Sequence, residues 1–281
     1  MNNNQKKVVK YYNNLESKFG FNLFLWGSKH FGFYPKGEKG MTEKKAQIIL
    51  QDLVAKKLDL RKNQKVLDAG CGQGVVSTYL AKNYGVEVSG ITLVPFESRS
   101  AQRMAKELKV EDRTNYQIMD YSSTNFDDNY FDAIYTTETL SHSPDINKTL
   151  KELFRILKPG GIFAFFEYTI AEDQRFSKQE RKMLDLVADG SAMMGLKSFR
   201  HDNFAKVIES AGFENVREKN ISENILPSFR RLYKFSIIPY AVIRILGLQR
   251  LFVNMTAAYE YYKMAEKDLI RYIVFTGKKP L

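Results

Sequence analysis

Short apolar runs alternate with helical patterns through the middle of the chain, from about residue 61 to residue 225. Val86 to Thr92 alternates with the period of two that is typical of a half-buried strand. Expected strands cover residues 65–68, 86–92, 116–120, 131–135, 162–168, 213–220 and 272–276, and expected helices cover 76–83, 99–108 and 146–157. Strands and helices that alternate at this spacing predict an α/β fold, with parallel βαβ units and helices on both faces of the sheet.

The two ends of the chain have a different pattern. Residues 8–60 are largely helical in pattern and rich in aromatic residues, and residues 226–265 mix apolar and basic side chains. We expect both ends to cover the central sheet. The most apolar stretch runs from Phe235 to Val253, but Pro239, Arg244 and Arg250 interrupt it, so we expect no membrane-spanning helix there.

Composition narrows the class of protein. The 281 residues are 44% hydrophobic and 27% charged, which is ordinary for a globular protein and excludes a disordered or fibrous chain. A single cysteine, Cys71, excludes an intrachain disulfide framework. The first seven residues are not followed by the apolar segment of a signal peptide, so we expect a cytoplasmic location.

The net charge of +11 belongs to the two ends. Residues 1–60 carry 11 basic and 5 acidic groups (+6), and residues 226–281 carry 10 and 3 (+7). The middle, residues 61–225, carries 22 basic and 24 acidic groups (−2). Such an excess suits nucleic acid, an anionic membrane surface or an acidic substrate, and solubility alone is the simplest alternative.

A glycine-rich segment follows the first expected strand and opens a helix. Val66 to Gly74 reads V-L-D-A-G-C-G-Q-G, and Val75 stands where a dinucleotide-binding fingerprint has its third glycine. The second strand ends at Thr92 and Leu93, without the acid that would hold the ribose of NAD. No G-K-[ST] follows, which excludes a P-loop. Glycines here let the backbone approach a ligand closely at the N-terminus of a helix.

An acid on the strand before G-x-G-x-G resembles class I S-adenosylmethionine-dependent methyltransferases, and the resemblance covers roughly residues 60–170. It implies a Rossmann-like sheet of seven strands, mostly parallel with the last strand antiparallel, and S-adenosylmethionine as cofactor. Asp120 would accept from the adenine amine, with Tyr121 beside it, and Glu97 would hold the ribose in place of an acid at Thr92. The expected cofactor-binding set is Asp68, Gly70, Cys71, Gly72, Thr92, Leu93, Glu97, Asp120, Tyr121, Thr137 and Ser28.

A narrower resemblance extends to both ends of the chain. Phe131 to Asp145 reads F-D-A-I-Y-T-T-E-T-L-S-H-S-P-D, which is similar to sterol 24-C-methyltransferases. Leu157 to Gly161 and the pair Glu167-Tyr168 are similar to the same family, as are the segments Tyr11-Tyr12, 26–31 and 272–280. Residues 172–265 match poorly, and the segment 92–95 looks more like cyclopropane-fatty-acid synthases and small-molecule methyltransferases. The resemblance divides the chain into an N-terminal helical lid (1–60), a cofactor-binding core (61–172), and an acceptor-binding cover with the closing strands (173–281).

This resemblance implies a set of catalytic residues: Glu138, His142, Tyr12 and Glu167. Methylation of an alkene creates a carbocation, which aromatic faces can stabilise and from which a carboxylate or imidazole can take a proton. Glu138 and His142 share a face if their turn is helical, although a simple helix-face pair is the alternative. Tyr11, Tyr12 and Trp26 would roof the site, unless they serve ordinary core packing. Ser28 would reach the methionine carboxylate of the cofactor.

Several functions remain open. We expect C-methylation of a hydrophobic isoprenoid or sterol-like acceptor, and the alternative is O- or N-methylation of a lipid, quinol or natural product. The chain has no P-P-[YFW] tetrapeptide and no second cysteine, which argues against nucleic acid as a partner. A cyclopropane synthase and a non-enzymatic binding module rank lower. No metal site is expected, because His30, His142 and His201 have no second cysteine near them. The oligomeric state is left open.

Basic and large apolar residues interleave from Phe229 to Arg250. Such a segment can lie in a membrane interface with its charges toward the headgroups. We therefore expect a protein peripheral to an anionic membrane, with vesicle binding weakened by charge reversal at Arg230, Arg231 and Lys234.

Overall fold

The computed structural model describes residues 1–25, 27–38 and 40–281, without the side chains of residues 19 and 21–23. Trp26, which we expect in the roof of the site, lies outside the described residues. No helix in the described part of the chain is long and apolar enough to cross a membrane.

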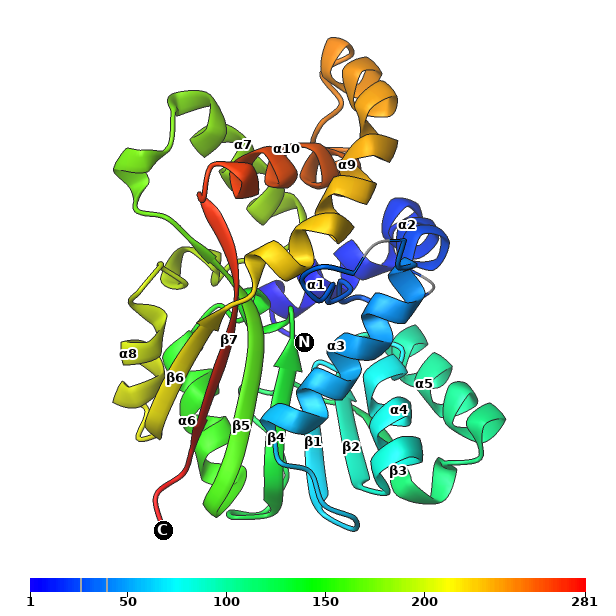
Figure 1. The fold of residues 1–281 in the computed structure, drawn as a ribbon, viewed down its shortest axis with the longest axis vertical. Coiled ribbons are helices and arrows are strands. Elements are labelled where there is room, and N and C mark those ends of the chain that lie inside the picture. The colour runs from blue at the N-terminus through cyan, green and yellow to red at the C-terminus, as the bar shows by residue number, and fades with distance from the viewer. Residues whose placement is uncertain (26, 39) are drawn as a thin grey trace.

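One seven-stranded sheet forms the centre of the protein (Figure 1). Its strands are β1 (Lys65–Ala69), β2 (Glu87–Thr92), β3 (Thr114–Ile118), β4 (Phe131–Thr137), β5 (Leu157–Ile170), β6 (Glu214–Asn220) and β7 (Ile270–Lys278). Their order across the sheet is β3-β2-β1-β4-β5-β7-β6, and β7 runs antiparallel to both of its neighbours. This order confirms the predicted α/β fold with an antiparallel last strand.

The strand boundaries differ from the expected ones by up to two residues, and by more at the start of β5. The fifth strand, expected from residue 162, starts at Leu157 as β5, so that Lys158 to Gly161 belong to it. The pairing with β4 jumps from Phe131–Leu157 to Ala133–Ile162, so these glycines form a bulge in the strand rather than a turn. β3 ends at Ile118, which places Asp120 in the turn after the strand.

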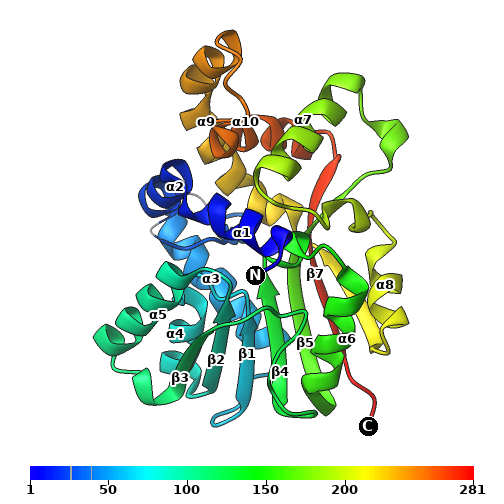
Figure 2. The ribbon, with the colours of Figure 1, turned by 180° about the vertical axis from the view of Figure 1, so that it is seen from behind.

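Ten α-helices are assigned in the described residues: α1 (Asn3–Asn13), α2 (Leu15–Leu25), α3 (Glu43–Lys57), α4 (Val75–Tyr84), α5 (Pro95–Leu108), α6 (Ile146–Ile156), α7 (Lys178–Gly190), α8 (Phe204–Ser210), α9 (Ser222–Ile245) and α10 (Val253–Glu266). Buried side chains of α3, α4 and α5 pack in one cluster against one face of the sheet. Helices α6 and α8 lie against the other face (Figure 2), and their buried side chains belong to a second cluster. The helices therefore lie on both faces, as the alternating pattern predicts.

Helix α6 shows why the sequence folds in this way. Its buried residues are Ile146, Thr149, Leu150, Leu153 and Ile156, whose spacing of three and four places them on one face. The Asp145 side chain caps the helix by accepting from the Lys148 backbone N–H at 3.0 Å.

The N-terminal and C-terminal helices gather beyond the ends of the parallel strands where β1, β2 and β4 finish (Figures 1 and 2). Val8 and Tyr11 of α1 belong to a small buried cluster with Val187 of α7 and Val253 of α10. Segments from the two ends of the chain therefore close over the same edge of the sheet.

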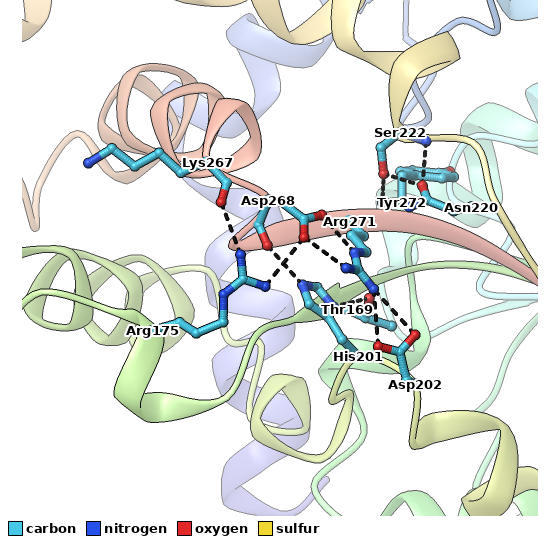
Figure 3. A network of polar contacts seen from close by, with 10 residues as sticks. All are labelled: Thr169, Arg175, His201, Asp202, Asn220, Ser222, Lys267, Asp268, Arg271 and Tyr272. Atoms are coloured by element: carbon cyan, nitrogen blue, oxygen red, sulfur yellow. Dashed lines mark hydrogen bonds and ion pairs between the residues drawn. The ribbon is translucent and has the colours of Figure 1, made fainter.

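A polar network fixes the start of β7 (Figure 3). Arg271 donates to the carboxylates of Asp268 and Asp202. The ring of His201 bridges the Thr169 hydroxyl at 2.7 Å and the Asp268 backbone carbonyl at 3.3 Å. This network joins the loop before α8 to β5 and β7.

Candidate active site

The glycine loop between β1 and α4 forms one wall of a cleft of about 270 Å³, which we call the glycine-loop cleft. Gly70 has a φ of +101°, a conformation that favours glycine. A Cβ on Gly70 would lie 2.7 Å from the Cβ of Thr139 and closer still to its hydroxyl. The loop can therefore press against the turn after β4 only if residue 70 has no side chain.

Asp68 lies beneath the loop. Its carboxylate accepts from the hydroxyls of Ser77 at 2.5 Å and Tyr135 at 2.6 Å, and it is 1% exposed. Burial raises its pKa to about 6, against the lowering effect of these two donors. Asp68 is not among the described residues that line the cleft, so it orders the loop by joining β1, β4 and α4.

Cys71 is also turned away from the cleft. Its Sγ lies 3.7 Å from the Gly72 carbonyl oxygen. The side chain belongs to the core cluster that also holds the buried side chains of α3, α4 and α5. Burial raises the pKa of the thiol, as expected for an unreactive side chain.

Most of the expected cofactor-binding residues do line the glycine-loop cleft. They are Gly70, Gly72, Thr92, Leu93, Glu97, Asp120, Tyr121 and Thr137. Asp120 accepts from the Gln5 side chain of α1 at 2.7 Å, and Tyr121 donates to the Thr139 carbonyl at 2.9 Å. The N-terminal helix therefore contacts the far end of the cleft directly.

Lys29 is a cleft residue that sequence reasoning missed. It pairs with Glu97, which also accepts from the Thr92 hydroxyl at 2.9 Å, and its Nζ lies 3.6 Å from the centre of the Tyr12 ring. The sequence feature that could have identified Lys29 is its position between Ser28 and His30, inside the segment 26–31 that resembles a known family. Ser28 itself is 2% exposed against the His30 backbone and is not among the described lining residues.

A second cavity, of about 200 Å³, lies beyond the cleft and is largely apolar. We call it the apolar cavity. Its walls come from α1, α2, α7, α9 and α10, together with the turn after β4 and Tyr168 of β5. Tyr12, Lys29, Glu138 and His142 line both the cavity and the cleft, so these four side chains form the boundary between them.

Glu138 is held on this boundary by an unusual backbone and three donors. Its φ is +58°, which is uncommon for a residue with a side chain and costs roughly 1–3 kcal/mol. Its Oε1 accepts from the Phe31 N–H and the Tyr272 hydroxyl, both at 3.0 Å, and its Oε2 accepts from the Tyr168 hydroxyl. Burial raises the pKa of Glu138 to about 8, although the donors oppose this.

The tyrosines around Glu138 also come from well-fixed strands. The backbone N–H of Tyr272 donates to the Ser222 hydroxyl at 2.9 Å, and Ser222 donates to Asn220 (Figure 3). The Tyr168 and Tyr272 rings meet edge to face, with centroids 5.2 Å apart. In the sequence both tyrosines stand out only as matches to a known family, because no local pattern shows that they meet at residue 138.

His142 forms a second polar group on the boundary. Its Nδ1 lies 3.0 Å from the Ala192 carbonyl oxygen, which can only accept, so the proton sits on Nδ1. The Nε2 therefore accepts from the Tyr12 hydroxyl at 2.8 Å. The turn is a 3-10 helix of Leu140–His142 that begins after Glu138, so the helical face expected for Glu138 and His142 is absent. The positive φ of Glu138 is the physical reason for this correction.

Glu167 lies under the same turn rather than at the boundary. Its Oε1 accepts from the Thr136 hydroxyl at 2.9 Å and from the backbone N–H groups of Thr139 and Leu140. It is fully buried, and burial raises its pKa to about 7. Glu167 is absent from the described lining of both cavities, so the geometry makes it a positioning residue for the segment that carries Glu138 and His142.

We expect the imidazole of His142 to stay neutral down to about pH 5, because burial lowers its pKa to about 4 from an ordinary value near 6.5. The contribution of His142 to the free energy of unfolding is complete above pH 6.5 and is lost as the pH falls toward 4. A histidine NMR titration, assigned with His142→Gln, measures this. In Tyr12→Phe the donor to Nε2 is lost and the midpoint should rise. A wild-type midpoint near 6.5 would contradict the buried geometry.

The glycine-loop cleft lies at the ends of parallel strands and joins an apolar cavity. This arrangement is typical of an enzyme that binds a cofactor beside its substrate. The family described as "Methyltransferase domain" matches residues 67–165. An S-adenosyl-L-methionine-dependent Diels-Alderase of Talaromyces variabilis is 31% identical over 98% of this chain and 96% of its own. The 24-methylenesterol C-methyltransferase 3 of Arabidopsis thaliana is 29% identical over 72% of this chain and 56% of its own. The solved structure of the cyclase SpnF superposes with a TM-score of 0.78, at 23% identity, over 99% of this chain and 97% of that one.

The chain belongs to the class I S-adenosylmethionine-dependent methyltransferases. It is an enzyme of that family, and S-adenosylmethionine is its cofactor. Its relatives include sterol C-methyltransferases, which confirms the predicted resemblance.

Proposed function

We propose that this methyltransferase acts on a carbon atom of a hydrophobic, isoprenoid or sterol-like acceptor. The observation that carries the proposal is Glu138, a partly buried carboxyl group on the boundary between the glycine-loop cleft and the apolar cavity. The similarity to a sterol C-methyltransferase supports it.

The described residues fit the cofactor. A Cβ on Gly72, which lines the cleft, would meet only the Lys29 side chain, at 3.4 Å, so a ligand can approach the backbone of the loop there. In this proposal Gly70 and Gly72 hold the methionine end, Thr92, Leu93 and Glu97 hold the ribose, and Asp120 and Tyr121 hold the adenine. Thr137 lines the cleft beside them, and Asp68 and Cys71 act from beneath the loop. S-adenosylmethionine, when bound, supplies an electrophilic methyl group.

The residues around Glu138 suit a reaction that passes through a cation. Phe31 and Phe229 lie with ring centroids 4.6 Å apart, and Tyr168 packs beside both. All three rings line the apolar cavity, where their faces can stabilise positive charge on a methylated acceptor. The carboxylate of Glu138 then takes the proton that the cation loses. Tyr12 and His142 position the acceptor on the same boundary.

A labelled methyl group tests the proposal. Enzyme, methyl-labelled cofactor and candidate acceptors (sterols, prenyl quinols and polyprenyl lipids) are incubated, and label is counted in the organic phase. We expect stable label on carbon in at least one acceptor class, identified by mass spectrometry. Label on oxygen or nitrogen would replace the proposal by heteroatom methylation. No label in any class would overturn it.

A second candidate is cyclisation with the cofactor retained. The relative named as a Diels-Alderase aligns with nearly the whole chain, including the segments that form the apolar cavity. In that reaction the neutral carboxyl of Glu138 and the Tyr12 hydroxyl would donate to a polarised diene or dienophile. The same assay separates the two functions, because cyclisation leaves the labelled cofactor intact while a substrate is converted to an isomer of equal mass.

A further inference from the structure

The α9–α10 hairpin carries an exposed apolar surface at its tip, which we define as residues 234–252. Ile238 is 78% exposed and Ile245 is 84% exposed. Other exposed apolar side chains of the tip are Phe235, Ile237, Val242, Leu246, Leu251 and Phe252. Figures 1 and 2 show this hairpin projecting from the end of the molecule, away from the sheet. Contiguous exposed apolar surface of this kind marks a binding site for a protein or a membrane.

The inner side of the hairpin is held in place. The rings of Tyr240 on α9 and Tyr259 on α10 stack with centroids 4.3 Å apart, and the Tyr240 hydroxyl donates to Glu260. Ile243 is buried on the same side. The tip is therefore an ordered part of the fold whose outer side presents the apolar residues.

Positive charges surround this apolar surface. Lys234, Arg244 and Arg250 are exposed, and the sequence from 234 to 252 contains no aspartate or glutamate. Two arginines named in the sequence analysis are engaged in the protein instead: Arg230 donates to the Tyr262 hydroxyl at 3.1 Å, and Arg231 pairs with Glu43 at 3.3 Å. Charge reversal at these two would disturb the fold, so they are poor probes of surface binding.

The tip is continuous with the apolar cavity. Phe235 lines the cavity and is also 55% exposed, with its ring 5.4 Å from that of Phe24 on α2. The cavity therefore reaches the surface beside the tip. An acceptor that enters there meets a lining that is largely apolar, with Glu16 and Asn254 among its few polar side chains.

We propose that the hairpin tip docks on an anionic lipid bilayer, and that an acceptor enters the apolar cavity from the bilayer past Phe235. The route of entry rests on the proposed function; the docking does not. Basic side chains beside apolar ones favour this partner, because the charges stay at the headgroups while the apolar residues insert. A second copy of this chain is the other occupant to test, although like charges would then face each other across the interface.

Vesicle sedimentation tests the docking without any methyl acceptor. We expect the enzyme to bind phosphatidylcholine vesicles that contain about one-third phosphatidylserine, and to bind pure phosphatidylcholine at least tenfold less. The triple variant Lys234→Glu, Arg244→Glu, Arg250→Glu should lower the partition coefficient by about tenfold or more. The pair Ile238→Ser and Ile245→Ser should lower it as well, at unchanged net charge.

The matched control is Lys106→Glu, Lys151→Glu, Lys206→Glu, which changes the net charge equally at exposed sites on α5, α6 and α8. It should bind vesicles more strongly than the tip variants, and all variants should keep the wild-type melting temperature. Equal loss in tip and control variants would show a general charge effect and overturn the proposal. A wild-type dimer in light scattering that Ile238→Asp converts to monomer, without vesicle binding, would assign the surface to a second copy.

Discussion

Glu138→Gln should abolish methylation of a carbon acceptor while cofactor binding stays nearly unchanged. Loss of a general base costs roughly 10²- to 10⁴-fold in rate. Glutamine keeps an oxygen that can accept from the Phe31 N–H and the Tyr272 hydroxyl, so the fold around residue 138 should persist. Calorimetry with S-adenosylmethionine and a turnover assay measure the two effects separately. Glu172→Gln, at an exposed surface position, is the matched control and should leave both unchanged.

The pH dependence of the wild type gives an independent check. The pKa of Glu138 is raised to about 8, so the group is mostly protonated at pH 7 and becomes a base as the pH rises. The rate of carbon methylation should therefore rise with pH until about 8 and then level. Tyr272→Phe removes one donor to the carboxylate, which should move this limb of the profile to higher pH. A flat profile, together with near-normal activity of Glu138→Gln, would favour O- or N-methylation with His142 as the base.

Gly70→Ala should have the largest effect on the protein itself. A left-handed backbone costs a residue with a Cβ roughly 1–2 kcal/mol, and forcing a Cβ against the side chain of Thr139 adds about 1–3 kcal/mol. We expect a loss of about 2–5 kcal/mol in the free energy of unfolding, measured in urea, and the loss of cofactor binding. Thr139 follows Glu138 directly, so its displacement should also disturb the catalytic boundary.

Gly37→Ala separates the cost of the left-handed backbone from the cost of the contact with Thr139. Gly37 has a φ of +86°, but nothing lies within 4 Å of the Cβ that alanine would add. It should lose only the backbone part, about 1–2 kcal/mol, with cofactor binding intact. Equal destabilisation by the two substitutions would show that the contact with Thr139 contributes nothing.

The sheet and the glycine loop could be predicted because their signals are local. The period-two pattern of β2, the helical pattern of α6 and the acid before the glycines each lie within about twelve consecutive residues. The predicted strands all exist, and their boundaries differ by one or two residues except at the irregular start of β5, which begins five residues early. The expected position of the cofactor residues at the strand ends followed from the topology.

The acceptor side could not be predicted in the same way. Glu138 meets Phe31 and Tyr272, which are 107 and 134 residues away in the chain, and no local pattern records such contacts. Its positive φ breaks the helix that the spacing to His142 suggested. Asp68 and Glu167 show another case: their motifs are visible in the sequence, but only the structure shows that both side chains lie beneath the surfaces they order.

Tyr12, Lys29, Glu138 and His142 separate the glycine-loop cleft from the apolar cavity. The walls of these two cavities come from different parts of the chain. The glycine-loop cleft is built largely from the segment that matches the methyltransferase family, residues 67–165, whereas α1, α2, α7, α9 and α10 lie outside that segment. Substitutions in these helices can reshape the acceptor cavity while the cofactor cleft stays intact. Such a division allows acceptor preference to diverge during evolution at little cost to the methyl donor site, and it makes the outer helices the natural target for a library that seeks new acceptors.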